Sequence, residues 1–355
     1  MKKKIYKNAK MLLTIASFLF ILSCAKEDMD NLSDTLYVRH KGADMPAHIY
    51  GNASEKVFLI LLHGGPGGEG LGYRSGTIKS EIEKECAVVY YDQRGSGMSQ
   101  GRYSEDGISI EIMTEDVLAL VKVIQNKYGD DSKFFLMGHS WGGTLGTSVM
   151  LKNQDIFKGW IEVGSANDAK NIYFEYPKNF RRVADEQIAL GNNVSYWEGV
   201  QRKIDGLNTD VYSDDDFYTM NKEAVKAQEK LSDDGFVNRL NSKIQGQAVI
   251  NTFFRNNILT VAWNGKITQS ILVRDQGIFE SLSFADRLSE ITIPSLTIWG
   301  KYDMVVPIKF AQETFGNLGS ASKELVIFEK SAHSPMYTEP DLFAEEVIDF
   351  ITAHK

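Results

Sequence analysis

The sequence predicts an α/β fold, in which helices cover a mostly parallel sheet and a helical insertion divides the core. Short apolar runs at 36–40, 47–50, 57–62 and 87–91 are each bounded by Gly, Asn, Ser or Asp, which is typical of strands. Apolar residues recur at helical spacing over 112–128, and the next apolar runs, at 134–137 and 160–163, flank a second helical segment. This alternation favours parallel strands joined by helices.

The pattern changes between 165 and 285, where polar, helix-compatible stretches are joined by Asp-rich segments such as SDDD at 213–216. The strand pattern returns at 293–299 and 324–328, and an amphipathic helix over 341–352 closes the chain. We therefore expect a core made of residues 36–164 and 286–355, with a helical cap over 165–285 between its two parts.

The N-terminus predicts export. Five lysines precede an apolar run over 11–22, which is too short to span a bilayer and is typical of a signal peptide over 1–23. The run ends at Ser23-Cys24, which resembles the lipobox of bacterial lipoproteins, where the cysteine is lipidated and becomes the mature N-terminus. We expect Cys24 to anchor the protein to a membrane, on the periplasmic or cell-surface face, with 24–35 as its tether. The alternative is an ordinary secretory signal that ends near a cysteine.

Composition excludes some function classes. The 355 residues carry a formal charge of −8, which becomes −13 without residues 1–23, so binding to nucleic acid is not expected. With Cys24 assigned to the anchor, Cys86 is left in an apolar stretch and no disulfide framework is available. The sequence has no metal-ligand cluster or nucleotide-binding loop, so we expect no cofactor.

The central motif is GHSWG at 138–142, which follows an apolar strand and precedes a helix-compatible stretch. A G-x-S-x-G in this context places its serine on a tight strand-to-helix turn, where neighbouring side chains would clash and the hydroxyl is exposed at the sheet edge. The motif therefore predicts Ser140 as a nucleophile. Because G-x-S-x-G also occurs by chance, the prediction depends on partner residues elsewhere in the chain.

A serine hydroxyl needs a base, and in this arrangement an acid and then a histidine follow the serine in the chain. Asp303 comes directly after the strand at 293–299, and His333 lies between the last predicted strand and the closing helix. We expect His333 to take the proton from Ser140, and Asp303 to hold the imidazole and stabilise the imidazolium. Asp286 and Asp341 are the alternative acids nearby in the sequence.

An acyl-transfer site also needs hydrogen-bond donors for the developing oxyanion. The run HGGPGG at 63–68 follows the strand at 57–62, and we expect the backbone N–H groups of Gly65 and Trp141 to form this hole. A merely flexible turn is the alternative. His63 is expected to be a structural hydrogen-bonding residue and not a second base.

Together, HGGPGG at 63–68, YYDQRGSGMS at 90–99 and GHSWGG at 138–143 make the chain similar to the prolyl aminopeptidase (proline iminopeptidase) branch of the α/β-hydrolase fold. The resemblance covers roughly 45–165 and 285–352 and implies an eight-stranded sheet with a helical cap. It also implies that Asp92, Gln93 and Arg94 form a structural loop.

The resemblance also bears on substrate binding, because aminopeptidases of this branch hold the substrate ammonium with cap carboxylates. YWEG at 196–199 resembles one such segment, which makes Glu198 a candidate ligand, with a solvated helix-surface glutamate as the alternative. Where a second carboxylate is expected, in VINTFF at 249–254, the chain has Asn251.

The sequence thus predicts a serine hydrolase that forms an acyl-enzyme. Small peptide or amide substrates are the leading expectation, and an esterase or other small-molecule hydrolase is the near alternative, because both reactions share a tetrahedral intermediate. A non-catalytic surface binding protein is a third reading, which loss of Ser140 or His333 would have favoured.

Overall fold

The computed structural model describes residues 28–208, 211–240 and 256–355. The predicted signal peptide, the predicted lipidation site Cys24 and the cap position Asn251 lie outside the described residues. In the part of the chain that the structure describes, no helix is long and apolar enough to cross a membrane.

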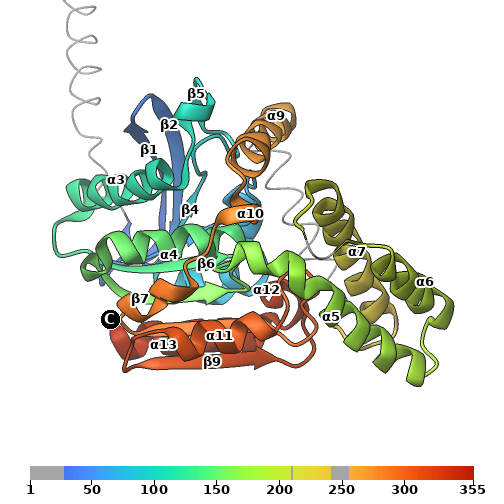
Figure 1. The fold of residues 1–355 in the computed structure, drawn as a ribbon. Coiled ribbons are helices and arrows are strands. Elements are labelled where there is room, and N and C mark those ends of the chain that lie inside the picture. The colour runs from blue at the N-terminus through green and yellow to red at the C-terminus, as the bar shows by residue number, and fades with distance from the viewer. Residues whose placement is uncertain (1–27, 209–210, 241–255) are drawn as a thin grey trace, which may run out of the picture.

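One twisted sheet forms the centre of the molecule (Figure 1). Its eight principal strands lie in the order β1-β2-β4-β3-β6-β7-β8-β9, and the two-residue β5 pairs with β2. β2 is antiparallel to β1, β4 and β5, and the other pairings are parallel, so the predicted mostly parallel sheet is confirmed. The strands are β1 (Leu32–His40), β2 (Ala43–Gly51), β3 (Val57–Leu62), β4 (Ala87–Tyr91), β5 (Gln100–Gly101), β6 (Lys133–His139), β7 (Phe157–Val163), β8 (Ser295–Gly300) and β9 (Lys323–Phe328).

The tether was expected to cover residues 24–35, but the fold begins before residue 36. A short helical turn, η1 (Met29–Asn31), precedes β1, and β1 begins at Leu32, where its pairing with β2 already starts opposite Gly51. Leu32 is buried, and Asp34 accepts hydrogen bonds from the Lys127 ammonium and the Tyr128 hydroxyl. Polar composition concealed this part of the strand, because backbone pairing does not require apolar side chains at every position.

Helices cover both faces of the sheet. All six residues of β3 are buried: Phe58, Ile60 and Leu62 pack in the cluster that includes α3 and α4, whereas Leu59 and Leu61 pack in the cluster that includes α13. This accounts for the unbroken apolar run of a central parallel strand. The longer helices are α3 (Ile110–Tyr128), α4 (Trp141–Asn153), α5 (Ala169–Ala189), α6 (Val194–Asp205), α7 (Asp214–Asp233), α9 (Ile258–Gln269), α11 (Lys309–Asn317) and α13 (Pro340–His354). The shorter ones include α2 (Glu83–Glu85), α10 (Ile278–Ser281) and α12 (Pro335–Thr338).

The chain between β7 and β8 is helical where it is described, as predicted. In Figure 1, α5, α6 and α7 project to one side of the sheet, and α9 and α10 lie closer to it. Phe180, Trp197 and Phe217 of α5, α6 and α7 share an apolar cluster with Trp299, the penultimate residue of β8. The cap therefore packs directly on the edge of the sheet where the parallel strands end.

Candidate active site

Ser140 occupies the turn between β6 and α4 and has a positive φ, which is rare for a residue with a side chain, with φ 55° and ψ −122°. The two glycines of the motif are required because there is no room for a side chain at either position. A Cβ on Gly138 would lie 2.3 Å from the carbonyl oxygen of Gly142, and a Cβ on Gly142 would lie 2.1 Å from that of Leu62. Since both contacts are with backbone, a side chain at either position would displace the turn, and the sequence motif is explained by local geometry.

The acid and the base predicted from the sequence are in contact. His333 Nδ1 lies 2.7 Å from Asp303 Oδ2. The other carboxylate oxygen of Asp303 accepts backbone N–H groups from Val305 at 2.9 Å and Val306 at 2.8 Å. Asp303 is buried, so its carboxylate has a fixed orientation and presents one oxygen to the imidazole. The alternative acids, Asp286 and Asp341, are both exposed.

The end of β7 brings Ser140, the candidate nucleophile, next to this pair. The Ser140 N–H donates to the Val163 carbonyl at 2.9 Å. The next residue, Gly164, lies so close to the acid and base that a Cβ on it would be 3.2 Å from His333 Nδ1 and 3.3 Å from Asp303 Oδ2. The structure therefore gathers Ser140, Asp303 and His333 at the carboxyl edge of the sheet, although Ser140 is more than 150 residues from the other two in the sequence.

The HGGPGG loop lies against the nucleophile. Gly65 and Trp141 both line the cavity that also contains Ser140, which is the placement required of oxyanion-hole donors. His63 is fully buried, its Nδ1 is 2.9 Å from the Gly64 carbonyl, and burial lowers the pKa of its imidazole to about 4. His63 is thus neutral at physiological pH and occupied by structural hydrogen bonds, as expected.

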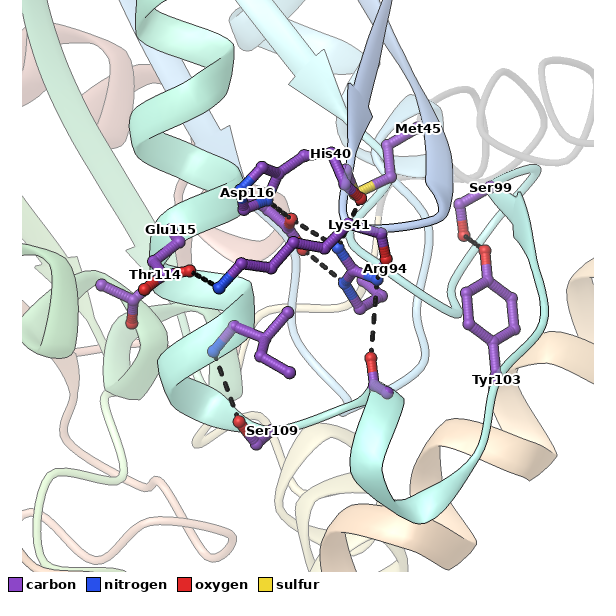
Figure 2. Close-up of polar contacts among 12 residues, drawn as sticks. His40, Lys41, Met45, Arg94, Ser99, Tyr103, Ser109, Thr114, Glu115 and Asp116 are labelled. Atoms are coloured by element: carbon purple, nitrogen blue, oxygen red, sulfur yellow. Dashed lines mark hydrogen bonds and ion pairs between the residues drawn. The ribbon is translucent and has the colours of Figure 1, made fainter.

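The loop at 92–94 is held by buried polar contacts, and Figure 2 shows those of Arg94. The Arg94 guanidinium makes two 2.7 Å hydrogen bonds with Asp116 on α3 and donates to the His40 carbonyl at 2.8 Å. Asp92 accepts from two backbone N–H groups, those of Gly70 and Met98, both at 2.8 Å. None of these contacts involves the triad residues, which agrees with a structural role for the loop.

A cavity of about 60 Å³ opens at Ser140. Its wall is mainly aliphatic and aromatic, and its polar members are uncharged. The lining residues include Ile172, Tyr176, Phe217, Asn221, Gln269, Phe279, Leu282 and Val305. No Asp, Glu, Lys or Arg is among the described residues that line it. A second, more open cleft of about 570 Å³ is lined by His333 and by residues of α7 that include Gln228 and Glu229.

The structure does not bring Glu198 to this cavity. Trp197 and Val200 on the same helix, α6, are buried in the cap, which turns Glu198 outward. Its side chain is 51% exposed, and one carboxylate oxygen lies 4.0 Å from Arg202. The position of Glu198 is that of a helix-surface glutamate, the alternative considered for it from the sequence.

Sequence reasoning missed three residues at the site. Gln228 of α7 accepts the backbone N–H of His333 at 3.0 Å, so the cap holds the base directly. Tyr73 and the motif residue His139 form a hydrogen-bonded chain to the backbone of His333. No sequence motif indicates the contacts of Gln228 and Tyr73. His139 occupies one of the two variable positions of G-x-S-x-G, so the motif assigns it no role. Among the described residues, no group of three or more His, Cys, Asp or Glu side chains could hold a metal ion.

Comparisons with known proteins identify the family. The sequence model described as "Serine aminopeptidase, S33" matches residues 54–230. The chain is 26% identical to "Probable aminopeptidase YbaC" of Bacillus subtilis, over 81% of this chain and 86% of that protein. It is 25% identical to "Proline iminopeptidase" of Saccharolobus solfataricus, over 89% of this chain and 91% of that protein.

Other curated relatives at similar identity are named as carbamate hydrolase and as esterase. A solved structure, described as a serine hydrolase involved in carbazole degradation, superposes with a TM-score of 0.60 at 17% identity, over 90% of this chain and 99% of that one. Its likeness establishes the α/β-hydrolase fold, with a mixed, mostly parallel eight-strand sheet and a helical insert. The chain therefore belongs to the α/β-hydrolase superfamily, as a serine hydrolase of the S33 family.

Proposed function

We propose that this protein hydrolyses small esters and amides, including peptides, through an acyl-enzyme on Ser140. The Ser140 hydroxyl attacks the carbonyl carbon while His333 Nε2 accepts its proton, and the same proton then goes to the leaving group. The N–H groups of Gly65 and Trp141 stabilise the oxyanion. Water, deprotonated by His333, then releases the acid and restores Ser140. The 2.7 Å contact between His333 and Asp303 supports this assignment, because it leaves Nε2 as the free nitrogen of the ring.

The lining of the cavity at Ser140 supports the proposed class of substrate. The acyl half of the substrate occupies the side of the site where the nucleophile and the oxyanion donors lie, and both line this cavity. Its aliphatic and aromatic wall favours an apolar, uncharged acyl group, since a buried charge without a partner is costly. The leaving group then departs next to His333, where the second cleft is open and carries charged side chains such as Glu229 and Arg239.

An aminopeptidase is the second candidate, and the relatives named as aminopeptidase and proline iminopeptidase favour it. That reaction places the free α-ammonium of the substrate inside the acyl cavity, where it needs a carboxylate partner. The described lining residues supply none, and Glu198 lies on the cap surface. We therefore give precedence to substrates whose acyl half is neutral.

A panel of chromogenic substrates separates the two candidates. The panel contains short and medium acyl esters, N-blocked prolyl and alanyl amides, and the same amides with a free amine. Turnover of the esters and blocked amides with little turnover of the free amines supports the first proposal, whereas exclusive cleavage of the free amines establishes the aminopeptidase. Ser140→Ala is the control, and turnover that survives it, or no turnover by the parent protein, rejects both.

We also propose that the protein is exported and lipidated on Cys24, on the strength of the N-terminal sequence. The first described residues lie at the amino ends of the parallel strands, where Ala53 donates to the Met29 carbonyl at 2.6 Å, and the site lies at their carboxyl ends. An anchor there turns the site away from the bilayer and favours water-soluble substrates. Incorporation of labelled palmitate that is lost in Cys24→Ser tests this proposal, and equal labelling of the two proteins rejects it.

A further inference from the structure

A chain of three hydrogen bonds connects the loop before the oxyanion hole to the loop that carries the base. The Gly64 N–H donates to the Tyr73 hydroxyl at 3.0 Å, and that hydroxyl lies 2.7 Å from His139 Nδ1. His139 Nε2 in turn lies 2.8 Å from the backbone carbonyl of His333. Gly64, Tyr73, His139 and His333 come from four separate segments of the sequence, and we call this chain the Tyr73–His139 relay.

The direction of every hydrogen in the relay follows from its partners. The His333 carbonyl can only accept, so His139 Nε2 must carry a hydrogen and donate. The Tyr73 oxygen already accepts from Gly64, and its own hydrogen is directed to His139 Nδ1, which accepts. Burial, followed by the proximity of His333, lowers the pKa of His139 to about 3, and burial raises the pKa of Tyr73 to about 12. Both side chains are thus neutral across the physiological range, and one tautomer of His139 satisfies all three contacts.

The relay completes the support of the base. The His333 ring is held by Asp303, its backbone N–H by Gln228 and its backbone carbonyl by His139. The His139 and His333 rings also lie against each other, with centroids 4.8 Å apart. Nε2 is then the one polar group of His333 outside these contacts, and it is the atom that must meet the Ser140 hydroxyl.

The relay also touches the nucleophile and the oxyanion loop. A Cβ on Gly64 would lie 3.3 Å from His139 Nδ1 and 3.3 Å from the Cβ of Ser140, so this backbone is packed closely on the turn. Gly64 directly precedes Gly65, whose N–H is assigned to the oxyanion hole. A shift of Tyr73 therefore moves the donor side of the site as well as the base.

We propose that Tyr73 and His139 are positioning residues. They hold the loop that carries His333 and the loop that carries Gly65 in place relative to Ser140. Neither residue touches the reacting atoms in this role, and the inference rests on the proposed hydrolase activity. It predicts that disturbing the relay lowers kcat while KM for an apolar acyl ester stays nearly constant, because the wall of the acyl cavity is formed by other residues.

Variants of the full chain separate the two ends of the relay. Tyr73→Phe removes the hydroxyl and leaves Gly64 N–H and His139 Nδ1 unpaired, and we expect kcat to fall about 10- to 100-fold. His139→Gln places an amide nitrogen near Nε2 and keeps a donor for the His333 carbonyl. His139→Asn places its amide near Nδ1 and loses that donor. We expect His139→Gln to retain at least about fivefold more kcat than His139→Asn.

A double-mutant cycle distinguishes a relay from two independent structural contacts. Combined with His139→Asn, the Tyr73→Phe change should cost much less than it does alone, because the connection to His333 is already broken. Tyr128→Phe is the matched control, since its hydroxyl bonds to Asp34 at 2.5 Å, far from the site. The proposal is wrong if Tyr73→Phe and Tyr128→Phe have the same kcat. It is also wrong if the fold-reduction in kcat of the double variant equals the product of the fold-reductions of Tyr73→Phe and His139→Asn.

A readout that needs no turnover keeps this test separate from the hydrolase proposal. In the ¹⁵N-histidine-labelled protein, His139, identified by its loss in His139→Gln, should show a neutral Nε2–H tautomer from pH 5 to 8, and the opposite tautomer or protonation in that range overturns the relay. Failure of the hydrolase proposal looks different, because the parent protein then shows neither turnover nor covalent labelling by a fluorophosphonate.

Discussion

Replacing Asp303 with asparagine tests how this carboxylate sets the tautomer of His333. One carboxylate oxygen accepts two backbone N–H groups at 2.8 and 2.9 Å, and the other accepts from His333 Nδ1. An asparagine keeps both backbone bonds only if its oxygen faces them, which turns its NH₂ group towards the imidazole. The ring then accepts at Nδ1 and carries its hydrogen on Nε2, where it cannot take the proton from Ser140.

We expect Asp303→Asn to lower kcat/KM by about 10⁴, or about 5 kcal/mol of transition-state stabilisation, with a thermal unfolding midpoint close to that of the parent protein. Initial rates with a chromogenic ester and a thermal melt measure the two quantities. Asp286→Asn and Asp341→Asn are matched controls, because both carboxylates are exposed. Activity of Asp303→Asn within tenfold of the parent, in a folded protein, would refute the assignment.

Three further predictions follow from contacts around the site. Gln228→Ala should lower kcat about tenfold, because it leaves the His333 N–H without its acceptor from the cap; unchanged steady-state rates would contradict this. Burial raises the pKa of the Glu162 carboxyl from 4.5 to about 7, so the folded protein binds the extra proton and loses stability as pH rises between those values. Glu162→Gln should therefore match the parent near pH 4.5 and exceed it by up to about 3 kcal/mol above pH 7 in urea unfolding, and a pH-independent difference would exclude this explanation. Gly142→Ala should destabilise the fold by about 3 kcal/mol and abolish activity, whereas Gly316→Ala, with open space around it on α11, should gain up to about 1 kcal/mol in the same assay.

The spacing of apolar residues and the order of the predicted strands and helices were sufficient to predict the core of the fold. The apolar runs at 57–62 and 87–91 coincide with β3 and β4, because buried parallel strands need apolar side chains on both faces. The start of β1 was missed, since the polar residues before Leu36 pair through their backbone. The boundary between tether and fold was therefore placed four residues too late.

The candidate triad was also visible in the sequence, because the chemistry restricts residue type and the fold restricts order along the chain. Ser140, Asp303 and His333 each follow a strand, and parallel strands bring such positions to one edge. Glu198 had no comparable constraint. The resemblance of YWEG to a family segment did not show which face of the helix turns inward. The burial of Trp197 on that helix places Glu198 on the outer face.

The sequence by itself determined the hydrolase core, the candidate nucleophile with its expected partners, and the glycines that the turn at Ser140 requires, because these depend on local geometry and on the order of strands. The tertiary structure alone decided what supports and surrounds them: the cap contact of Gln228 with His333, the relay through Tyr73 and His139, and the cavity at Ser140, whose described lining residues are uncharged. These features join residues that are distant in the chain through side chains with no required spacing. Only the packing of the folded core and cap brings such side chains together.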